Sequence, residues 1–184
     1  MNLFPLNNDY ATLGTGCFWC TEAIFSSLKG VISVESGFSG GKTPNPSYED
    51  ICSGNSGYAE VVRIQYDPNS LSYKDLLKFF WSSHDPTTLN RQGNDVGTQY
   101  RSVIFFHDEE QEQIAKQSLS EISNSNIFDK PIVTEITQLV NYYPAEDYHQ
   151  KYYENVGNRN PYCAIVITPK LQKFRKEFED FIKK

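Results

Sequence analysis

Six apolar segments follow one another along the chain in an order that few folds accommodate. The first segment reads as a strand, and the second, after a glycine turn, carries apolar residues at helical spacing. Two strands, a second helix and a further strand come next. The segments are residues 10–13, 18–28, 31–38, 59–66, 76–81 and 101–106. This β-α-β-β-α-β order predicts an α+β fold with a ferredoxin-like split βαβ core.

Two long polar loops, residues 40–57 and 84–99, interrupt these segments. Loops of this length inside a compact domain usually carry function. Ser72 and Asp75 have the spacing of a capping box before the second helix. Beyond the fourth strand we expect a polar helix over residues 108–123, a strand over 132–140 and an irregular tyrosine-rich segment. A final helix follows, with Leu171, Phe174, Phe178 and Phe181 on one side.

Length and charge limit what the chain does. Its 184 residues show no linker or repeat, so residues 1–184 are predicted to form a single catalytic domain. A net charge of -6 disfavours nucleic acid and acidic membrane surfaces as partners, and no apolar run approaches the roughly 20 residues of a membrane helix. Residues 1–9 lack the features of a secretory signal. We therefore expect a cytoplasmic monomer.

Cys17 stands where the turn Gly14-Thr15-Gly16 leads into the first helix. Unpaired backbone N–H groups and the positive end of the helix dipole face such a position, and both favour the thiolate. Thiolate, rather than thiol, is the nucleophilic form of cysteine. We predict that Cys17 is a nucleophile.

Cys20 completes a C-x-x-C spacing with Cys17, which brings two sulfurs to one end of a helix. Zinc ordinarily needs two such pairs or added histidines, and His84, His107 and His149 show no ligand pattern. We therefore expect no metal site. Phe18 and Trp19 are either core aromatics or the wall of an apolar substrate pocket.

Four segments carry a resemblance to a known family. They are Gly16-Cys17-Phe18-Trp19 and residues 52–62, 90–102 and 145–150. In this order they resemble the Gly-Cys-Phe-Trp signature, the Cys-Ser-Gly segment, the second polar loop and the third motif of the peptide methionine sulfoxide reductase A family. The resemblance covers nearly the whole chain. It implies reduction of the S epimer of methionine sulfoxide, free or within proteins, and hence protein repair under oxidative stress.

The resemblance also implies roles for single residues. Cys17 attacks the sulfoxide sulfur and Glu60 supplies a proton, which burial of its carboxyl favours by raising the pKa. The other implied roles are oxygen binding by Tyr48 and Tyr100, orientation of the cysteine region by Asp95, and a cradle for the methyl group made by Phe18 and Trp19. His149 matches the third motif without an assigned step. Tyr58 stands where many relatives have histidine, and Phe38 replaces a usual tyrosine.

Reduction of the substrate leaves Cys17 as a sulfenic acid, which condenses with a second thiol to form a disulfide. Many relatives have glycine at the position of Cys20 and carry recycling cysteines in a C-terminal tail. Here the last cysteine is Cys163. We expect Cys20 to resolve the sulfenic acid, with Cys163 as the alternative and Cys52 packed in the core. Thioredoxin as an external reductant then reopens the disulfide, and no bound cofactor is required.

Two other functions are compatible with these residues. A disulfide oxidoreductase would use the C-x-x-C pair directly, in a thioredoxin-like arrangement. An interaction module would use the aromatic residues as a peptide-binding face. The disulfide oxidoreductase gives no role to the two polar loops, with Glu60 beside the first and Asp95 in the second.

Overall fold

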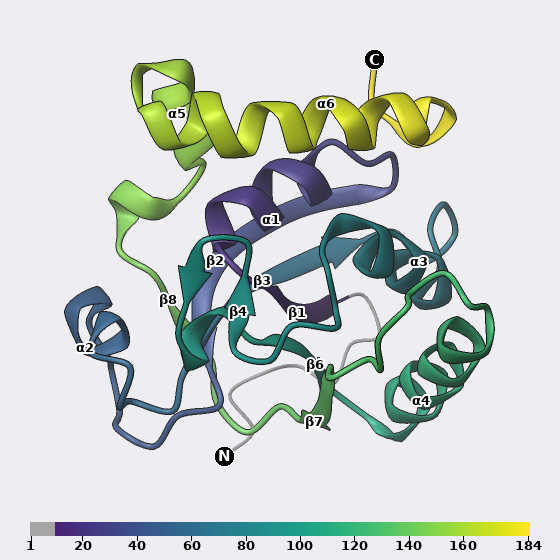
Figure 1. The fold of residues 1–184 in the computed structure, drawn as a ribbon, viewed down its shortest axis with the longest axis horizontal. Helices are drawn as coiled ribbons and strands as arrows, with labels where there is room; N and C mark the ends of the chain where they lie inside the picture. The colour runs from purple at the N-terminus through teal and green to yellow at the C-terminus, as the bar shows by residue number, and fades with distance from the viewer. Residues whose placement is uncertain (1–9) are drawn as a thin grey trace.

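A mixed six-stranded sheet forms the centre of the computed structural model, which describes residues 10–184 (Figure 1). Its strand order is β7-β6-β1-β3-β2-β8, and all neighbours are antiparallel except β6 and β7. The strands are β1 (Tyr10–Thr15), β2 (Val31–Ser39), β3 (Ala59–Tyr66), β6 (Ser102–Phe106), β7 (Glu135–Gln138) and β8 (Tyr143–Pro144). The fold is therefore α+β with a central mixed sheet.

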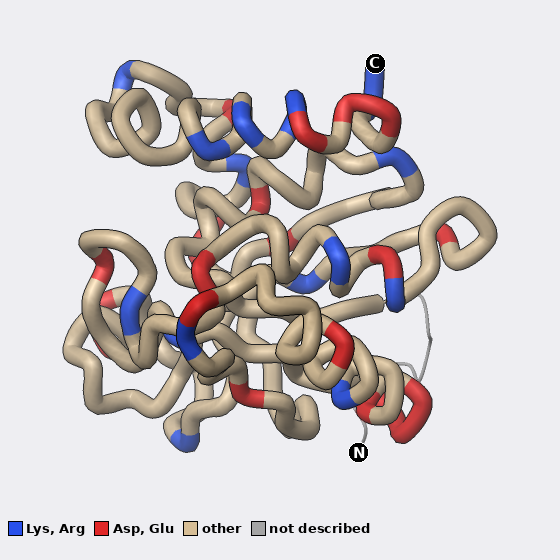
Figure 2. The backbone as a smooth tube through the Cα atoms, turned by 45° about the vertical axis from the view of Figure 1, so that its right-hand side comes forward, with Lys and Arg blue, Asp and Glu red and all other residues tan. Residues whose placement is uncertain are grey.

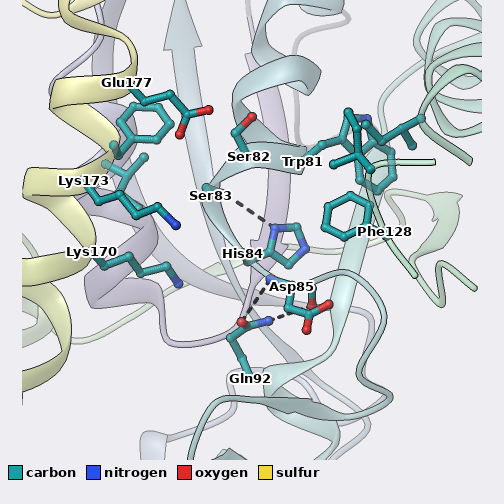
Figure 3. A pocket seen from close by; sticks show the side chains of 14 residues that line it. Trp81, Ser82, Ser83, His84, Asp85, Gln92, Phe128, Lys170, Lys173 and Glu177 are labelled. Carbon is teal, nitrogen blue, oxygen red and sulfur yellow. Dashed lines mark hydrogen bonds between the residues drawn. The ribbon is translucent and has the colours of Figure 1, made fainter. Parts of the chain in front are cut away.

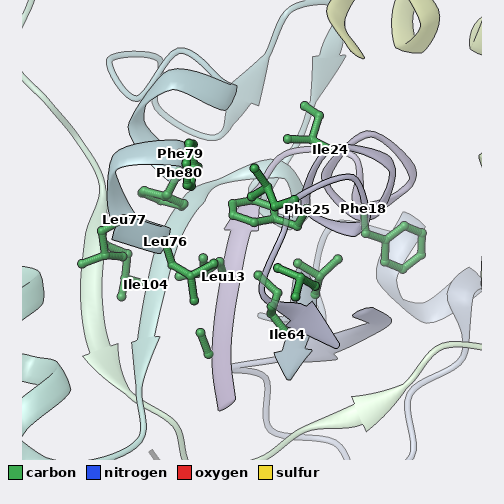
Figure 4. Close-up of a cluster of buried hydrophobic side chains, with 14 of the residues drawn as sticks. Leu13, Phe18, Ile24, Phe25, Ile64, Leu76, Leu77, Phe79, Phe80 and Ile104 are labelled. Atoms are coloured by element: carbon green, nitrogen blue, oxygen red, sulfur yellow. The ribbon is translucent and has the colours of Figure 1, made fainter. Parts of the chain in front are cut away.

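Helices α1 (Phe18–Ser26) and α3 (Tyr73–Ser83) connect the inner strands and pack on one face of the sheet. Apolar residues from the strands alternate toward them, as a half-covered antiparallel sheet requires. Figure 4 shows Leu13, Ile64 and Ile104 meeting Phe25 and Leu76 in this layer, and all five are fully buried. The opposite face carries a smaller cluster made by Ala59, Val61, Val103, Phe105 and Tyr142.

Both long loops contain short elements that periodicity did not reveal. The first holds α2 (Tyr48–Cys52), where Ser47 and Asp50 form a reciprocal capping box. The second holds the hairpin β4 (Arg91–Gln92) and β5 (Asp95–Val96), followed by the 3₁₀ turn η1 (Thr98–Tyr100). The hairpin packs against Gly16 at the end of β1.

The second helix begins earlier than its apolar residues suggest. Ser72 is the N-cap and accepts a hydrogen bond from the Asp75 N–H at 3.0 Å, so the helix starts at Tyr73 rather than at residue 76. Helix α4 (Glu109–Asn124) agrees closely with the predicted polar helix and is capped by Asp108. The strand expected over residues 132–140 is paired only over β7, Glu135–Gln138.

The C-terminal part wraps back over the first helix. After η2 (Asp147–His149), α5 (Tyr152–Val156) and η3 (Gly157–Arg159), a π-helical turn η4 (Cys163–Ile167) leads into α6 (Thr168–Glu177), which lies across α1 in Figure 1. The final turn is η5 (Glu179–Phe181). The helix thus ends before Phe178, yet Phe178 and Phe181 still contact the Phe79 ring, at 5.1 and 5.4 Å between centroids. The expected apolar side is present, although it continues past the helix end.

In Figure 2 the charged residues of α6 are mainly Lys and Arg, and acidic residues gather at its C-terminal end and in η5. None of the helices within residues 10–184 has the length and apolar character needed to cross a membrane. The expectation drawn from residues 1–9 falls outside the described part of the chain.

Candidate active site

Cys17 lies at the junction of β1 and α1, where the chain makes the predicted glycine turn. Gly16 has a φ of 110°, a backbone conformation that residues other than glycine rarely adopt. A Cβ atom there would also lie 2.7 Å from Cβ of Gln92, so the turn packs closely against the β4–β5 hairpin. Cys17 is the N-cap of α1, and its carbonyl oxygen accepts the Thr21 N–H at 3.3 Å. Its side chain is half-buried.

The Cys17 and Cys20 thiols share a hydrogen bond, and this changes the expected ionisation. The hydrogen bond with Cys20 and the burial of the Cys17 thiol raise the pKa of Cys17. The backbone N–H groups of Trp19 and Cys20 lower the pKa of Cys17, as expected at a helix N-terminus, but do not outweigh those effects. The same hydrogen bond lowers the pKa of Cys20. The hydrogen bond between the two thiols therefore favours ionisation of Cys20 over Cys17, whereas the helix start considered alone favours the thiolate at Cys17.

Glu60 on β3 lies against the start of α1 with only 2% of its surface exposed. Its Oε2 accepts the backbone N–H of Phe18 at 3.0 Å, which places the carboxyl beside Cys17. Burial and the nearby Cys17 sulfur raise the pKa of Glu60 well above the usual value for glutamate. The carboxyl is thus held as an acid within the polypeptide's interior.

Tyr48 from α2 and Tyr100 from η1 both approach Glu60, although they belong to different loops. Burial and the charge of Glu60 raise the pKa of Tyr48 and likewise that of Tyr100. Both phenols therefore remain protonated hydrogen-bond donors. The backbone N–H of Tyr48 donates to Glu146 Oε1 at 3.0 Å, which ties α2 to the segment after β8.

Asp95 lies on the hairpin strand β5 and is held by a residue that the sequence did not single out. The Tyr162 hydroxyl donates to Asp95 Oδ2 at 2.6 Å. Tyr162 also meets the Trp19 ring edge-on at 6.1 Å between centroids. Through Tyr162, the second polar loop and the C-terminal segment join beside the cysteines.

Trp19 and Phe18 have different environments. Trp19 is half-buried and its ring stacks on Tyr152, with 3.8 Å between centroids and 7° between planes. Phe18 is 1% exposed and lies on the Phe38 ring. Of the two residues expected to form an apolar cradle, Phe18 therefore belongs to the core, and only Trp19 reaches the surface.

His149 occupies the centre of this aromatic group. Its Nδ1 accepts the Trp19 Nε1–H at 3.1 Å, and its ring lies 4.4 Å from that of Tyr48. Its Nε2 is buried without a hydrogen-bond partner, 3.9 Å from Glu146 Oε2. Burial lowers the pKa of His149, so the neutral ring fixes the orientation of Trp19.

Of the other two cysteines, Cys163 and Cys52, only Cys163 is buried. Cys163 is fully buried in a cluster that includes Cys20 and Ile167, with Cys17 packed against it. Both proposed resolving thiols thus lie near Cys17. Cys52, expected in the core, is exposed at the end of α2 because this short helix turns its last residue outward. Its thiol lies beside the Tyr48 hydroxyl, and that contact contributes to the raised pKa of Tyr48.

A pocket of about 190 Å³ opens directly over the two sulfurs. Its lining comprises Cys17, Cys20, Gln92, Gly93, Asn94, Asp95, Tyr162, Val166 and Lys170. A larger pocket of about 510 Å³ adjoins it between α6 and the end of α3, and Gln92 and Lys170 line both (Figure 3). Within residues 10–184, no group of three His, Cys, Asp or Glu residues is arranged to hold a metal ion.

The sequence alone missed Tyr152, Tyr162 and Lys170 because each reaches the site from a distant segment. The tyrosine-rich composition of residues 142–162 was the only available signal, and it does not say which rings pack on Trp19. The function of His149 was likewise left open, since its partners come from α1 and α2.

Comparison with known proteins gives one consistent result. The family model described as peptide methionine sulfoxide reductase matches residues 9–182. A peptide methionine sulfoxide reductase MsrA of Saccharolobus solfataricus is 53% identical over 175 residues, covering 95% of this chain and 97% of the relative. Reduced Mxr1 from Saccharomyces cerevisiae has a similar structure, with a TM-score of 0.76 and 34% identity over 86% of this chain and 88% of that one. Mxr1 in complex with Trx2 also matches, with a TM-score of 0.56 and 25% identity over 83% of this chain and 89% of that one.

Proposed function

The chain belongs to the peptide methionine sulfoxide reductase family and reduces methionine sulfoxide, and we propose that it does so with Cys17 as nucleophile and Glu60 as acid. The observation that supports these roles best is the position of Glu60. Its carboxyl is buried beside Cys17 and is fixed by the Phe18 N–H. A protonated carboxyl at this place is able to donate to an oxygen bound over the Cys17 sulfur.

In the first step the Cys17 sulfur attacks the sulfur of the sulfoxide. The S–O bond of the substrate breaks and the oxygen ends on Cys17, so that one thiol and one sulfoxide become one sulfenic acid and one thioether. The thiol supplies the two electrons that reduce methionine sulfoxide. Proton donation from Glu60 neutralises the negative charge that develops on the oxygen, and the Cys17 thiol proton restores the acid.

Tyr48 and Tyr100 bind the sulfoxide oxygen in this scheme. Their phenols stay protonated because of burial and the neighbouring Glu60. Two donors directed at a developing oxyanion stabilise the transition state more than the ground state. Asp95 acts through Tyr162, whose hydroxyl it holds beside the cysteines.

We propose that the methyl group of the substrate contacts the exposed part of Trp19, and that the buried Phe18 ring lies beneath it. His149 and Tyr152 hold the indole in one orientation. A rigid apolar wall next to two oxygen-binding phenols distinguishes the two sulfoxide epimers. With the methyl group held on the wall, the oxygen of only one epimer points toward the phenols, and in the other epimer the sulfur lone pair takes that place. The proposed substrate is the S epimer, free or in oxidised proteins.

Regeneration uses a second thiol. Cys20 is the proposed resolving residue because its hydrogen bond to Cys17 already brings the two sulfurs together. The balance is one thiol plus one sulfenic acid giving one disulfide and water. Thioredoxin is the proposed external reductant, supported by the related Mxr1 that was solved in complex with Trx2. This cycle requires no bound cofactor, and we propose that it takes place in the cytoplasm on a monomer.

We infer that β6, β1, β3 and β2 form a ferredoxin-like split βαβ core, because β1 and β2 are parallel on either side of β3 and are joined through α1. Strands β3 and β6 have the same relation around β1, through α3.

The test of the function is an epimer-resolved assay on peptide-bound methionine sulfoxide with dithiothreitol as reductant. We expect consumption of the S epimer alone and loss of turnover in Cys17→Ser. Turnover of the R epimer contradicts the stereochemistry, and turnover by Cys17→Ser contradicts the nucleophile. The reading as a general disulfide oxidoreductase predicts no sulfoxide reduction at all, and the family match opposes it.

A further inference from the structure

Lys170 reaches the cysteine pair from the far end of the sequence. It lies in the first turns of α6, a segment that packs on α1, and lines the pocket above Cys17 and Cys20. Figure 3 shows its side chain leaving the helix toward Gln92, whereas Lys173 lies farther along the same helix near Glu177. Of the two lysines, only Lys170 lines the pocket over the sulfurs.

Lys170 is also the only cation among the residues lining that pocket. Within residues 10–184 its ammonium group forms no ion pair with a carboxylate inside 4.0 Å. The one carboxylate of the pocket, Asp95, accepts the Tyr162 hydroxyl instead. A positive charge without an acidic partner thus faces two sulfurs, one of which is almost completely removed from water.

The burial of Cys20 makes a nearby positive charge important for its ionisation. Cys20 is 4% exposed, and a thiolate in that environment loses most of its hydration. Ionisable groups surround Cys20 from several elements. They are Cys17 at the start of α1, Asp95 of β5, Tyr152 and Tyr153 of α5, Tyr162 just before the π-helical turn, Cys163 within that turn, and Lys170 of α6. Asp95 disfavours a negative sulfur, and Lys170 is the one cation in this set that opposes Asp95 and burial.

Resting on the proposed function, we propose that Lys170 is a positioning residue for regeneration: its charge holds the negative charge of the cysteine pair on Cys20. Cys20 then attacks the sulfenic acid of Cys17. The new S–S bond forms between the two sulfurs, the S–O bond on Cys17 breaks, and the oxygen leaves as water after taking up the proton released by Cys20. The direction of the ionisation agrees, since Lys170 is among the causes that lower the pKa of Cys20.

The expected size of the effect follows from thiol chemistry. Removing a cation near a thiol raises its pKa by about one unit, which reduces the thiolate fraction about ten-fold at lower pH. A more basic thiolate is also intrinsically more nucleophilic, by about three-fold for this change. The rate of disulfide formation in Lys170→Met should therefore fall about three-fold at pH values below the pKa of Cys20.

The decisive experiment measures the ionisation of Cys20 directly. In a Cys17→Ser background, the rate of Cys20 alkylation by iodoacetamide is followed against pH by peptide mass spectrometry. Lys170→Met should move the midpoint upward by about one pH unit, while Lys170→Arg and the matched control Lys173→Met keep the original midpoint. An unchanged midpoint in Lys170→Met, or an equal change in Lys173→Met, overturns the proposal.

A single-turnover measurement separates this proposal from the proposed function. With Cys17 intact and at a pH below the Cys20 alkylation midpoint, Lys170→Met should release methionine no more slowly than the unmodified enzyme and form the disulfide about three-fold more slowly. Equal disulfide rates overturn the role of Lys170. Absence of methionine release from the unmodified enzyme overturns the proposed function instead, and the alkylation midpoints still decide the role of Lys170.

Discussion

Phe38 and Glu60 are directly paired across β2 and β3, so their side chains project from the same face of the sheet. Phe38 is fully buried and touches Phe18, which in turn donates its backbone N–H to Glu60. The carboxyl therefore has one hydrogen bond from the helix start and an aromatic hydrocarbon neighbour on the adjacent strand. This pairing explains how the pKa of an acidic residue on a central strand comes to be raised.

Replacing Glu60 with glutamine should slow sulfoxide reduction by roughly 10²- to 10⁴-fold, the usual range for loss of a general acid. Glutamine retains an oxygen for the Phe18 N–H but has no transferable proton. In the unmodified enzyme, the single-turnover rate should fall as pH rises through the raised pKa of Glu60. Glu60→Gln should lack this part of the pH profile. A rate close to that of the unmodified enzyme at neutral pH would contradict the acid role.

The same substitution should stabilise the fold at high pH. Because the pKa of Glu60 is higher in the folded than in the unfolded chain, its contribution to stability is complete at low pH and is lost as pH rises through the folded pKa. Glutamine avoids this loss. Thermal unfolding by circular dichroism should give a higher Tm for Glu60→Gln at alkaline pH, by about 2–4 °C for each kcal/mol gained, and little difference at acidic pH. An equal Tm at alkaline pH contradicts the argument.

Phe38→Tyr tests the apolar neighbour. A hydroxyl beside the buried carboxyl reduces the cost of its ionisation, so the pKa of Glu60 should fall. The alkaline decline of the single-turnover rate should then move to lower pH. Phe105→Tyr is the matched control, because Phe105 is equally buried but belongs to the cluster on the opposite face of the sheet. A decline that stays in place in Phe38→Tyr, or moves equally in both variants, contradicts the prediction.

The sequence predicted the parts of this site that depend on local pattern. The position of Cys17 follows from the glycine turn, and the strand that carries Glu60 follows from periodicity, whereas the role of Glu60 came only from the family resemblance. Cys52 was misplaced because α2 is too short to show a helical period. The stacking of Tyr152 on Trp19 and the hydrogen bond between Tyr162 and Asp95 join distant segments, and no local pattern records such contacts.

The ionisation of the cysteine pair was missed for a related reason. A helix start favours thiolate when one sulfur is considered alone. Here the second thiol of the C-x-x-C spacing hydrogen-bonds to the first, which raises the pKa of Cys17 and lowers the pKa of Cys20. The direction of that hydrogen bond and the burial of the two thiols depend on the folded structure, and neither is readable from spacing.

Cys20→Ser should allow the first turnover but prevent normal regeneration. One equivalent of methionine is then released, and Cys17 accumulates as sulfenic acid, which dimedone labels. Cys163→Ser is the control, since Cys163 lies in the same cluster but is fully buried. It should form the Cys17–Cys20 disulfide normally by peptide mapping. A Cys17–Cys163 linkage in the unmodified enzyme would show that Cys163 is the resolving thiol.

The ionisation of the pair also predicts which sulfur the reductant attacks. In thiol–disulfide exchange the sulfur with the lower pKa leaves more readily, and the accessible sulfur is attacked. Cys17 is half-buried, whereas Cys20 is 4% exposed and has the lowered pKa. A thioredoxin whose second active-site cysteine is replaced by serine should therefore bond to Cys17, as the S–S bond breaks and the electron pair stays on Cys20. Trapping the released thiol with N-ethylmaleimide and mapping the peptides should find alkylated Cys20 and thioredoxin on Cys17. Thioredoxin bound to Cys20 would contradict both the charge distribution and the access that we infer for the pair.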